Sequence, residues 1–98
     1  MDVNYAFQGI NFAWHDEKAS ANFGKHGVLF ESACEAFFDP FFIVEDAGVV
    51  EGEPREAVIG LTKNWQLLFV VYVMLGEVAR LISARAATSG ERKRYENQ

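Results

Sequence analysis

Two short segments of this chain combine charge with the ability to move a proton. Lys25 and His26 are neighbours, and histidine is the side chain that titrates near neutral pH. Glu53 lies two residues before Arg55, so a carboxylate stands beside a guanidinium at the expected start of a strand. Such groups can act as general acid and base on an anionic substrate. The simpler alternatives are a helix end that favours positive charge and a solvated acidic loop.

A third group of candidate residues lies near the carboxy-terminal end of the chain. Residues 80–98 hold five basic residues against two acidic ones, a net charge of +3. Residues 1–79 hold four basic residues against twelve acidic ones, a net charge of −8. A cationic end on an acidic body predicts a locally bound anion, with phosphate as the first candidate. Arg80 and Arg85 are the expected phosphate ligands, and Arg92 and Arg94 would extend the track.

These arginines also have ordinary interpretations. Arg80 and Arg85 can be exposed residues of an edge strand, where charge discourages aggregation. They have opposite parity along the expected strand, so they reach one site only if the strand ends or bulges near Ala84. Arg92 and Arg94 can simply be cations near the end of a helix.

Several other chemistries find no support in the sequence. The two histidines have no cysteine pair nearby and the acids lack calcium-loop spacing, so we expect neither metal nor cofactor. Cys34 is alone and lies on the apolar side of a predicted helix, which indicates a core residue in a reducing compartment. There is no apparent secretion signal, and the longest apolar run is far shorter than the roughly 20 residues that span a bilayer. We therefore expect a cytoplasmic protein with no membrane partner.

The hydrophobic pattern predicts which elements position the candidate residues. Asp39-Pro40 should end the second helix, and Thr88 with Glu91 forms a predicted capping box for the last one. Residues 67–73 lack polar alternation and should form a central strand covered on both faces. We expect helices at 16–25, 30–38 and about 89–96, strands at 10–14, 41–45, 55–62, 65–74 and 77–84, and an acidic loop at 46–54.

This order predicts one α+β domain over residues 1–98. Its mostly antiparallel sheet would have four to five strands, with two helices near the amino terminus and one at the carboxy terminus. Residues 1–9 are expected to be a weakly structured lead-in.

Several segments together resemble the BrnT toxin family, over roughly residues 12–96. Their order and spacing carry the resemblance. The segments are Trp14-His15-Asp16-Glu17-Lys18-Ala19 with Asn22, Lys25-His26-Gly27-Val28 with Phe30-Glu31, Phe38-Asp39-Pro40, Arg55 with Ile59-Gly60, and Ile82-Ser83-Ala84-Arg85 with Ala87-Thr88, Glu91-Arg92 and Tyr95.

The resemblance implies a RelE-like fold and a ribonuclease toxin of a type II toxin–antitoxin pair. Its partner would be a BrnA-type antitoxin, and the complex would contact promoter DNA mainly through that antitoxin. A homo-oligomer is compatible with this. On the matching positions, the active-site residues would be Lys25, His26, Glu53, Arg55, Arg80 and Arg85.

The chain departs from the family pattern at three positions. His15 stands where the family commonly has Asp, Ala86 where a Lys is common, and Met74 where a polar or acidic residue is frequent. The last two remove polar groups near the expected site. The sequence thus leaves three hypotheses. The first is a metal-independent ribonuclease cutting by 2′-hydroxyl attack, and the second is a catalytically weakened homologue that mainly binds antitoxin and co-represses. The third is a purely structural or oligomerising protein.

Overall fold

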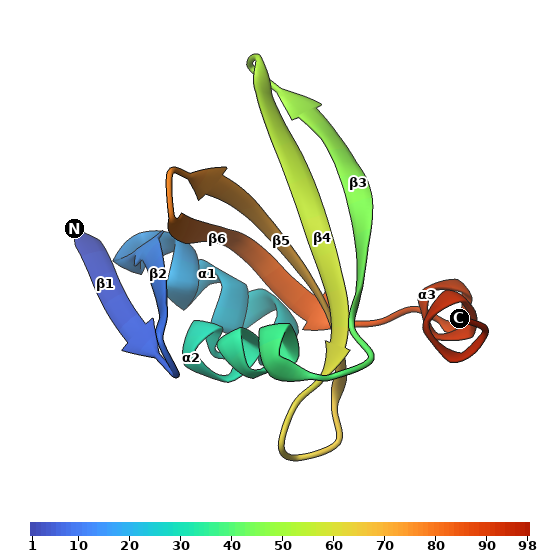
Figure 1. Ribbon diagram of the computed structural model, residues 1–98. Coiled ribbons are helices and arrows are strands. Elements are labelled where there is room, and N and C mark those ends of the chain that lie inside the picture. The colour runs from blue at the N-terminus through green and yellow to red at the C-terminus, as the bar shows by residue number, and fades with distance from the viewer.

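Six strands form one mixed sheet in the order β1-β2-β6-β5-β4-β3, in a computed structural model that describes residues 1–98 (Figure 1). Neighbouring strands are antiparallel except for β2 and β6, which are parallel. The strands are β1 (Asp2–Phe7), β2 (Ile10–His15), β3 (Ile43–Val50), β4 (Glu53–Leu61), β5 (Leu67–Leu75) and β6 (Val78–Ala86).

The helices α1 (Asp16–His26) and α2 (Phe30–Ala33), with the 3-10 turn η1 (Cys34–Phe38), cover one face of this sheet. Phe30, Ala33 and Cys34 are buried against Leu68 and Val70 of β5, which confirms Cys34 as a core residue. The last helix, α3 (Ser89–Glu96), lies at the end of the sheet (Figure 1). The α+β class, the three helices and the capping box of Thr88 and Glu91 are confirmed.

Two sequence expectations were wrong because two-residue hairpin turns were missed. Residues 1–9 are not a weakly structured lead-in: β1 pairs with β2 through a turn at Gln8-Gly9. The expected acidic loop at 46–54 is instead the end of β3, a turn at Glu51-Gly52, and the start of β4. Both turns have positive φ at their two central residues, the geometry that matches the twist of paired strands. The sheet therefore has six strands rather than four to five.

The parallel contact of β2 with β6 was also not predicted. Only three residue pairs form it, from Asn11–Val78 to Ala13–Arg80. Beyond Arg80 the edge of β6 that faces away from β5 has no strand neighbour. Helix α1 packs against this free edge through Asn22.

A β-bulge in β6 decides which side chains share a face. Arg80 pairs with Val73 and Arg85 pairs with Phe69, but one extra residue of β6 lies between the two pairs, at Ile82. Val73 and Phe69 are four residues apart, so they lie on one face of β5. Because of this bulge, Arg80 and Arg85 lie on the same face of the sheet. Ala84 lies on the opposite face, so the expectation that Arg80 and Ala84 share a face was wrong.

Gly60 marks the closest approach of the helical layer to the sheet. A Cβ at this position would collide with the backbone carbonyl of Ala36. We expect Gly60→Ala to lower the free energy of unfolding by about 2 kcal/mol, because backbone rather than a flexible side chain must move. Urea unfolding would measure this, with Gly24→Ala in α1, where a Cβ meets nothing, as the control. Equal unfolding midpoints for the two variants would contradict the expectation.

Candidate active site

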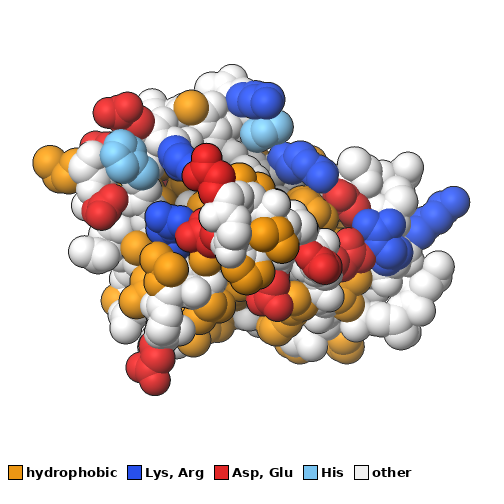
Figure 2. Space-filling view, turned by 90° about the horizontal axis from the view of Figure 1, so that it is seen from above, with side chains coloured by type: hydrophobic (Ala, Val, Ile, Leu, Met, Phe, Trp, Pro, Cys, Tyr) orange, Lys and Arg blue, Asp and Glu red, His pale blue; other side chains and the backbone are white.

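The face of the sheet opposite α1 and α2 carries the charged candidates. We call it the arginine face and define it by Arg55, Arg80, Arg85 and Glu53. Side chains of β4 point alternately to the two faces of the sheet, and Val58 points to the helix side because it lies in the core. Arg55 and Glu53 are an odd number of residues from Val58, so they point to the opposite face. Figure 2 shows Lys and Arg side chains alternating with Asp and Glu across one side of the molecule, with both histidines visible there.

Glu53 holds two of these arginines together. Both of its carboxylate oxygens accept hydrogen bonds from Nη2 of Arg80 at 3.1 Å, and Nη2 of Arg55 lies 4.0 Å from Oε1. The Nε atoms of Arg55 and Arg80 are buried and donate to no acceptor. Glu53, Arg55 and Arg80, which the sequence analysis placed in two separate groups, thus form one cluster. The Nε–H groups of both arginines have no hydrogen-bond acceptor in it.

Arg85 forms a separate arrangement at the other end of β6. Its guanidinium stacks 4.4 Å above the centre of the Phe69 ring and donates to both oxygens of Glu91, at 2.8 and 2.9 Å. The hydrogen bonds that Arg85 donates to Glu91 raise the pKa of Arg85 and outweigh the opposing effect of burial. The sequence analysis did not select Glu91 as a site residue, although its capping-box position was visible.

The Arg85 pair predicts a pH dependence of stability. Hydrogen bonds from Arg85, opposed by partial burial, hold the pKa of Glu91 below its usual value of about 4.5. A carboxyl group with a lowered folded-state pKa stabilises the fold above its unfolded-state pKa, and this stabilisation is lost as the pH falls through the folded value. We expect the melting temperature to fall below about pH 4.5, and Glu91→Gln to weaken this dependence. An unchanged pH profile in Glu91→Gln would contradict it.

The carboxy-terminal end of α1 is fixed to β6 by Asn22. Its side chain donates to the carbonyl of Ala84 at 2.9 Å and accepts from the amide of Ala84, also at 2.9 Å. It thereby replaces the strand neighbour that β6 lacks at this point. A third bond runs from Asn22 to the carbonyl of Val28 at 3.0 Å. Asn22 had only one signal in the sequence, its place in the family pattern.

This contact brings the last turn of α1, which carries Lys25 and His26, to the end of β6 that carries Arg85. His26 is four residues after Asn22, so the two lie on the same face of α1. Ala84, the partner of Asn22, directly precedes Arg85 in β6. Both Lys25 and His26 are exposed. Gly27, in the left-handed conformation with φ of 70°, ends the helix immediately after them, as predicted.

The candidate residues do not all converge on one point. Arg80 and Arg85 are five residues apart on one strand, roughly 15 Å at the usual rise per residue. This backbone separation suits contacts with two neighbouring phosphates of a nucleic-acid strand. Lys25 and His26 belong to the Arg85 end, and Glu53 and Arg55 belong to the Arg80 end.

The two arginines of α3 are engaged by carboxylates. Arg94 pairs with Glu45 of β3, and Nη1 of Arg92 lies 3.9 Å from Glu96. Both side chains are about half exposed. They stay candidates for RNA binding, and the Arg94–Glu45 pair also anchors α3 to β3.

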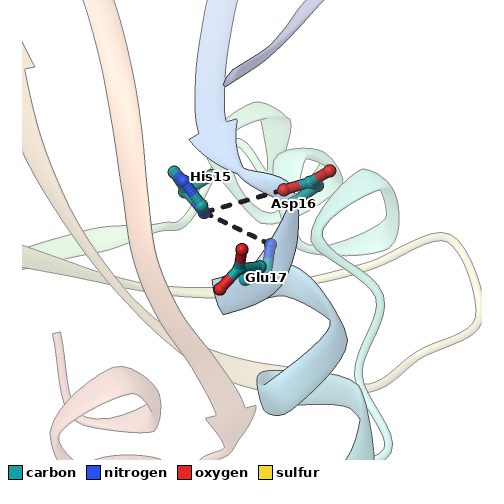
Figure 3. Close-up of side chains that lie close together, drawn as sticks. All are labelled: His15, Asp16 and Glu17. Atoms are coloured by element: carbon teal, nitrogen blue, oxygen red, sulfur yellow. Dashed lines mark hydrogen bonds and ion pairs between the residues drawn. The ribbon is translucent and has the colours of Figure 1, made fainter. Parts of the chain in front are cut away.

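The start of α1 brings three potential metal ligands together, His15, Asp16 and Glu17 (Figure 3). Nδ1 of His15 accepts a hydrogen bond from the Glu17 amide at 3.3 Å and lies 3.7 Å from Oδ1 of Asp16. His15 is therefore the helix cap, and two acids in the first turn complement the helix dipole. The arrangement is explained by helix initiation alone.

A cavity of about 550 Å³ lies away from these residues. It is lined by Phe7, Phe38 and Trp65 among others, and none of the candidate residues contributes to it. We therefore place the candidate site on the arginine face and not in this cavity.

The fold defines a class of small α+β proteins whose mixed sheet is covered by helices on one face and carries charged residues on the other. In a comparison with solved structures, the 1.1 Å crystal structure of the Brucella abortus ribonuclease toxin BrnT matches with a TM-score of 0.53. The identity is 22%, and the match covers 78% of this chain and 94% of that one. This likeness confirms the expected fold.

The family follows from the sequence comparison. Residues 14–91 match the family described as "Ribonuclease toxin, BrnT, of type II toxin-antitoxin system". The chain belongs to the BrnT family, as its motifs indicated, and membership implies ribonuclease activity and a cognate antitoxin. Among curated proteins, none matches this chain in sequence. The helices are all too short or too polar to span a bilayer.

Proposed function

We propose that this chain is a metal-independent endoribonuclease that cuts RNA by attack of the ribose 2′-hydroxyl. The observation that carries the proposal is the attachment of α1 to β6 through Asn22. His26 follows Asn22 by one helical turn, so this contact supports a position for its imidazole near the edge of the arginine face. Family membership supports RNA as the substrate.

In this reaction the 2′-oxygen bonds to phosphorus and the bond from phosphorus to the 5′-oxygen breaks. A base removes the 2′ proton, and an acid protonates the leaving oxygen. His26 or Glu53 would carry the proton, and Lys25 would add positive charge. Arg85 would stabilise charge on the phosphoryl oxygens of the scissile group, since a guanidinium can donate to two oxygens at once. Arg80 and Arg55 would hold the neighbouring part of the strand.

Neutralisation would come from a BrnA-type antitoxin, and promoter DNA would be contacted only within that complex. The acidic body of the toxin favours a basic partner. A homo-oligomer and a cytoplasmic location are compatible with this arrangement.

The test is to express the chain without antitoxin and to map RNA ends over time, with His26→Gln as the comparison. The proposal expects growth arrest, and fragments with 2′,3′-cyclic phosphate and 5′-hydroxyl ends that form equally well in the presence of a chelator. Slower formation of the same ends by His26→Gln would support His26 as proton carrier. Fragments with 5′-phosphate ends would contradict the chemistry.

One observation favours the second candidate, a weakened toxin that mainly binds antitoxin. Arg80 and Arg85 are both engaged by carboxylates, Glu53 and Glu91, so RNA must compete for them. Ala86 and Met74 are exposed and supply no replacement charge. Unaffected growth, intact RNA and a stable complex with the antitoxin would favour this candidate.

A further inference from the structure

A second cavity lies on the opposite side of Arg80 from Glu53. It has a volume of about 140 Å³ and is lined by Asp2, His15, Lys18, Arg80, Leu81 and Ile82. His15 and Lys18 come from the junction of β2 and α1, and Arg80 is paired with β2 through Ala13. Three side chains that can donate to an anion thus meet at one opening.

This cavity continues the arginine face. Phe12 and Trp14 of β2 point into the core beneath the helices, so His15, with the opposite parity, lies on the side of Arg80. Because β2 runs parallel to β6 with Ala13 opposite Arg80, His15 lies level with Ile82, so His15 and Lys18 add donors beside β6 between Arg80 and Arg85. A single strand of nucleic acid carries one charge at each phosphate, so a row of separated cations is suited to follow it.

The hydrogen bonding of His15 leaves one donor available. Its Nδ1 accepts from the Glu17 amide, so the proton of a neutral ring is on Nε2. The amino group of Met1 lies 3.3 Å from Nε2, but an N–H at Nε2 cannot accept from that group. The Met1 amino group instead donates to Asp16 at 3.0 Å. Nε2 of His15 can therefore donate to a phosphate oxygen in either protonation state.

We propose that His15, Lys18 and Arg80 form a phosphate subsite that binds the RNA strand one or more nucleotides away from the scissile bond. This inference rests on the proposed ribonuclease function and adds binding residues to it. Asp2, in the same cavity, weakens the subsite by repulsion. The family pattern commonly has Asp at position 15, so this subsite would distinguish the chain from such relatives.

The experiment measures binding without cleavage. A short, fully 2′-O-methylated oligonucleotide keeps its phosphates but lacks the attacking hydroxyl, so its affinity is independent of the catalytic step. Fluorescence anisotropy at several salt concentrations gives the dissociation constant and the salt slope. The variants are Lys18→Gln, His15→Asp and Asp2→Asn, with Lys63→Gln, an exposed lysine of the β4–β5 turn, as the control.

We expect Lys18→Gln to weaken binding by about three- to tenfold and to reduce the salt slope by about 0.7, the value for one single-strand phosphate contact. His15→Asp should weaken binding at least as much, and because aspartate is itself a good helix cap, α1 should still form. Asp2→Asn should tighten binding, and Lys63→Gln should change nothing. In cleavage of ordinary RNA, Lys18→Gln should raise KM and leave kcat almost unchanged.

Parental affinity and parental salt slope in both Lys18→Gln and His15→Asp would overturn the subsite, even with ribonuclease activity intact. A parent protein that cuts RNA but does not bind the methylated strand at low salt would overturn it as well. Loss of cleavage in His26→Gln with normal binding tests the catalytic proposal separately. The two proposals can therefore fail independently.

Discussion

Replacing Arg85 by alanine is expected to slow RNA cleavage by on the order of a hundredfold, the usual cost of one electrostatic donor to a developing charge. Arg85 lies beside the end of α1 and is held over Phe69 and against Glu91, so its guanidinium is already oriented. A positioned donor needs little reorganisation during the reaction. The measurement is the rate of fragment formation under single-turnover conditions.

The stability of the Arg85 variant must be controlled, because the substitution leaves the Glu91 carboxylate without its partner. The double variant Arg85→Ala/Glu91→Gln removes both charges and should regain much of the lost melting temperature without regaining cleavage. Arg85→Lys keeps the charge but not the forked geometry, so we expect intermediate activity. Parental cleavage by the double variant would show that Arg85 has no role in the reaction.

Replacing Asn22 by alanine should have the largest effect on stability. The substitution removes three hydrogen bonds at a buried position, and it leaves the amide and carbonyl of Ala84 and the carbonyl of Val28 without partners. Unpaired buried polar groups cost about 1–3 kcal/mol each, with part recovered by relaxation, so we expect a loss of about 3 kcal/mol. Urea unfolding measures it, and Ser20→Ala, an exposed position of α1, is the matched control.

The same variant tests how α1 contributes to the site. Asn22→Asp keeps the acceptor for the Ala84 amide but places a buried carboxylate against the carbonyls of Ala84 and Val28, so it should be at least as destabilised as Asn22→Ala. Cleavage per folded molecule should fall in both, because Lys25 and His26 are no longer held beside β6. Unchanged cleavage by the folded fraction of Asn22→Ala would separate α1 from the reaction.

The sequence alone was sufficient to predict the helices and strands that have a strong hydrophobic pattern. The apolar spacing on α2 and η1, the Gly27 cap and the unbroken apolar run in β5 are local signals, and the structure contains each element. The hairpin turns were missed because Gln8 and Glu51 are unusual residues for a positive φ. The side chains of Val3, Tyr5 and Phe7 alternate at period two and would have indicated β1.

The site was harder to predict because its geometry depends on contacts between distant segments. The bulge at Ile82 places Arg80 on the face of Arg85, and nothing in the local sequence fixes where such a bulge falls. The pairing of Arg80 with Glu53 joins strands that are not adjacent in the sheet. His15 was not predicted as a site residue, although its parity along β2 places it on the side of Arg80.

The bond between Asn22 and Ala84 joins positions 62 residues apart, and the β2–β6 pairing closes a loop of similar length. Closing so long a segment carries an entropic cost before any of these contacts form, which slows folding relative to local hairpins. The arginine face is therefore complete only once β6 has paired with β5 and α1 has joined it through Asn22, so partly folded molecules lack the candidate site.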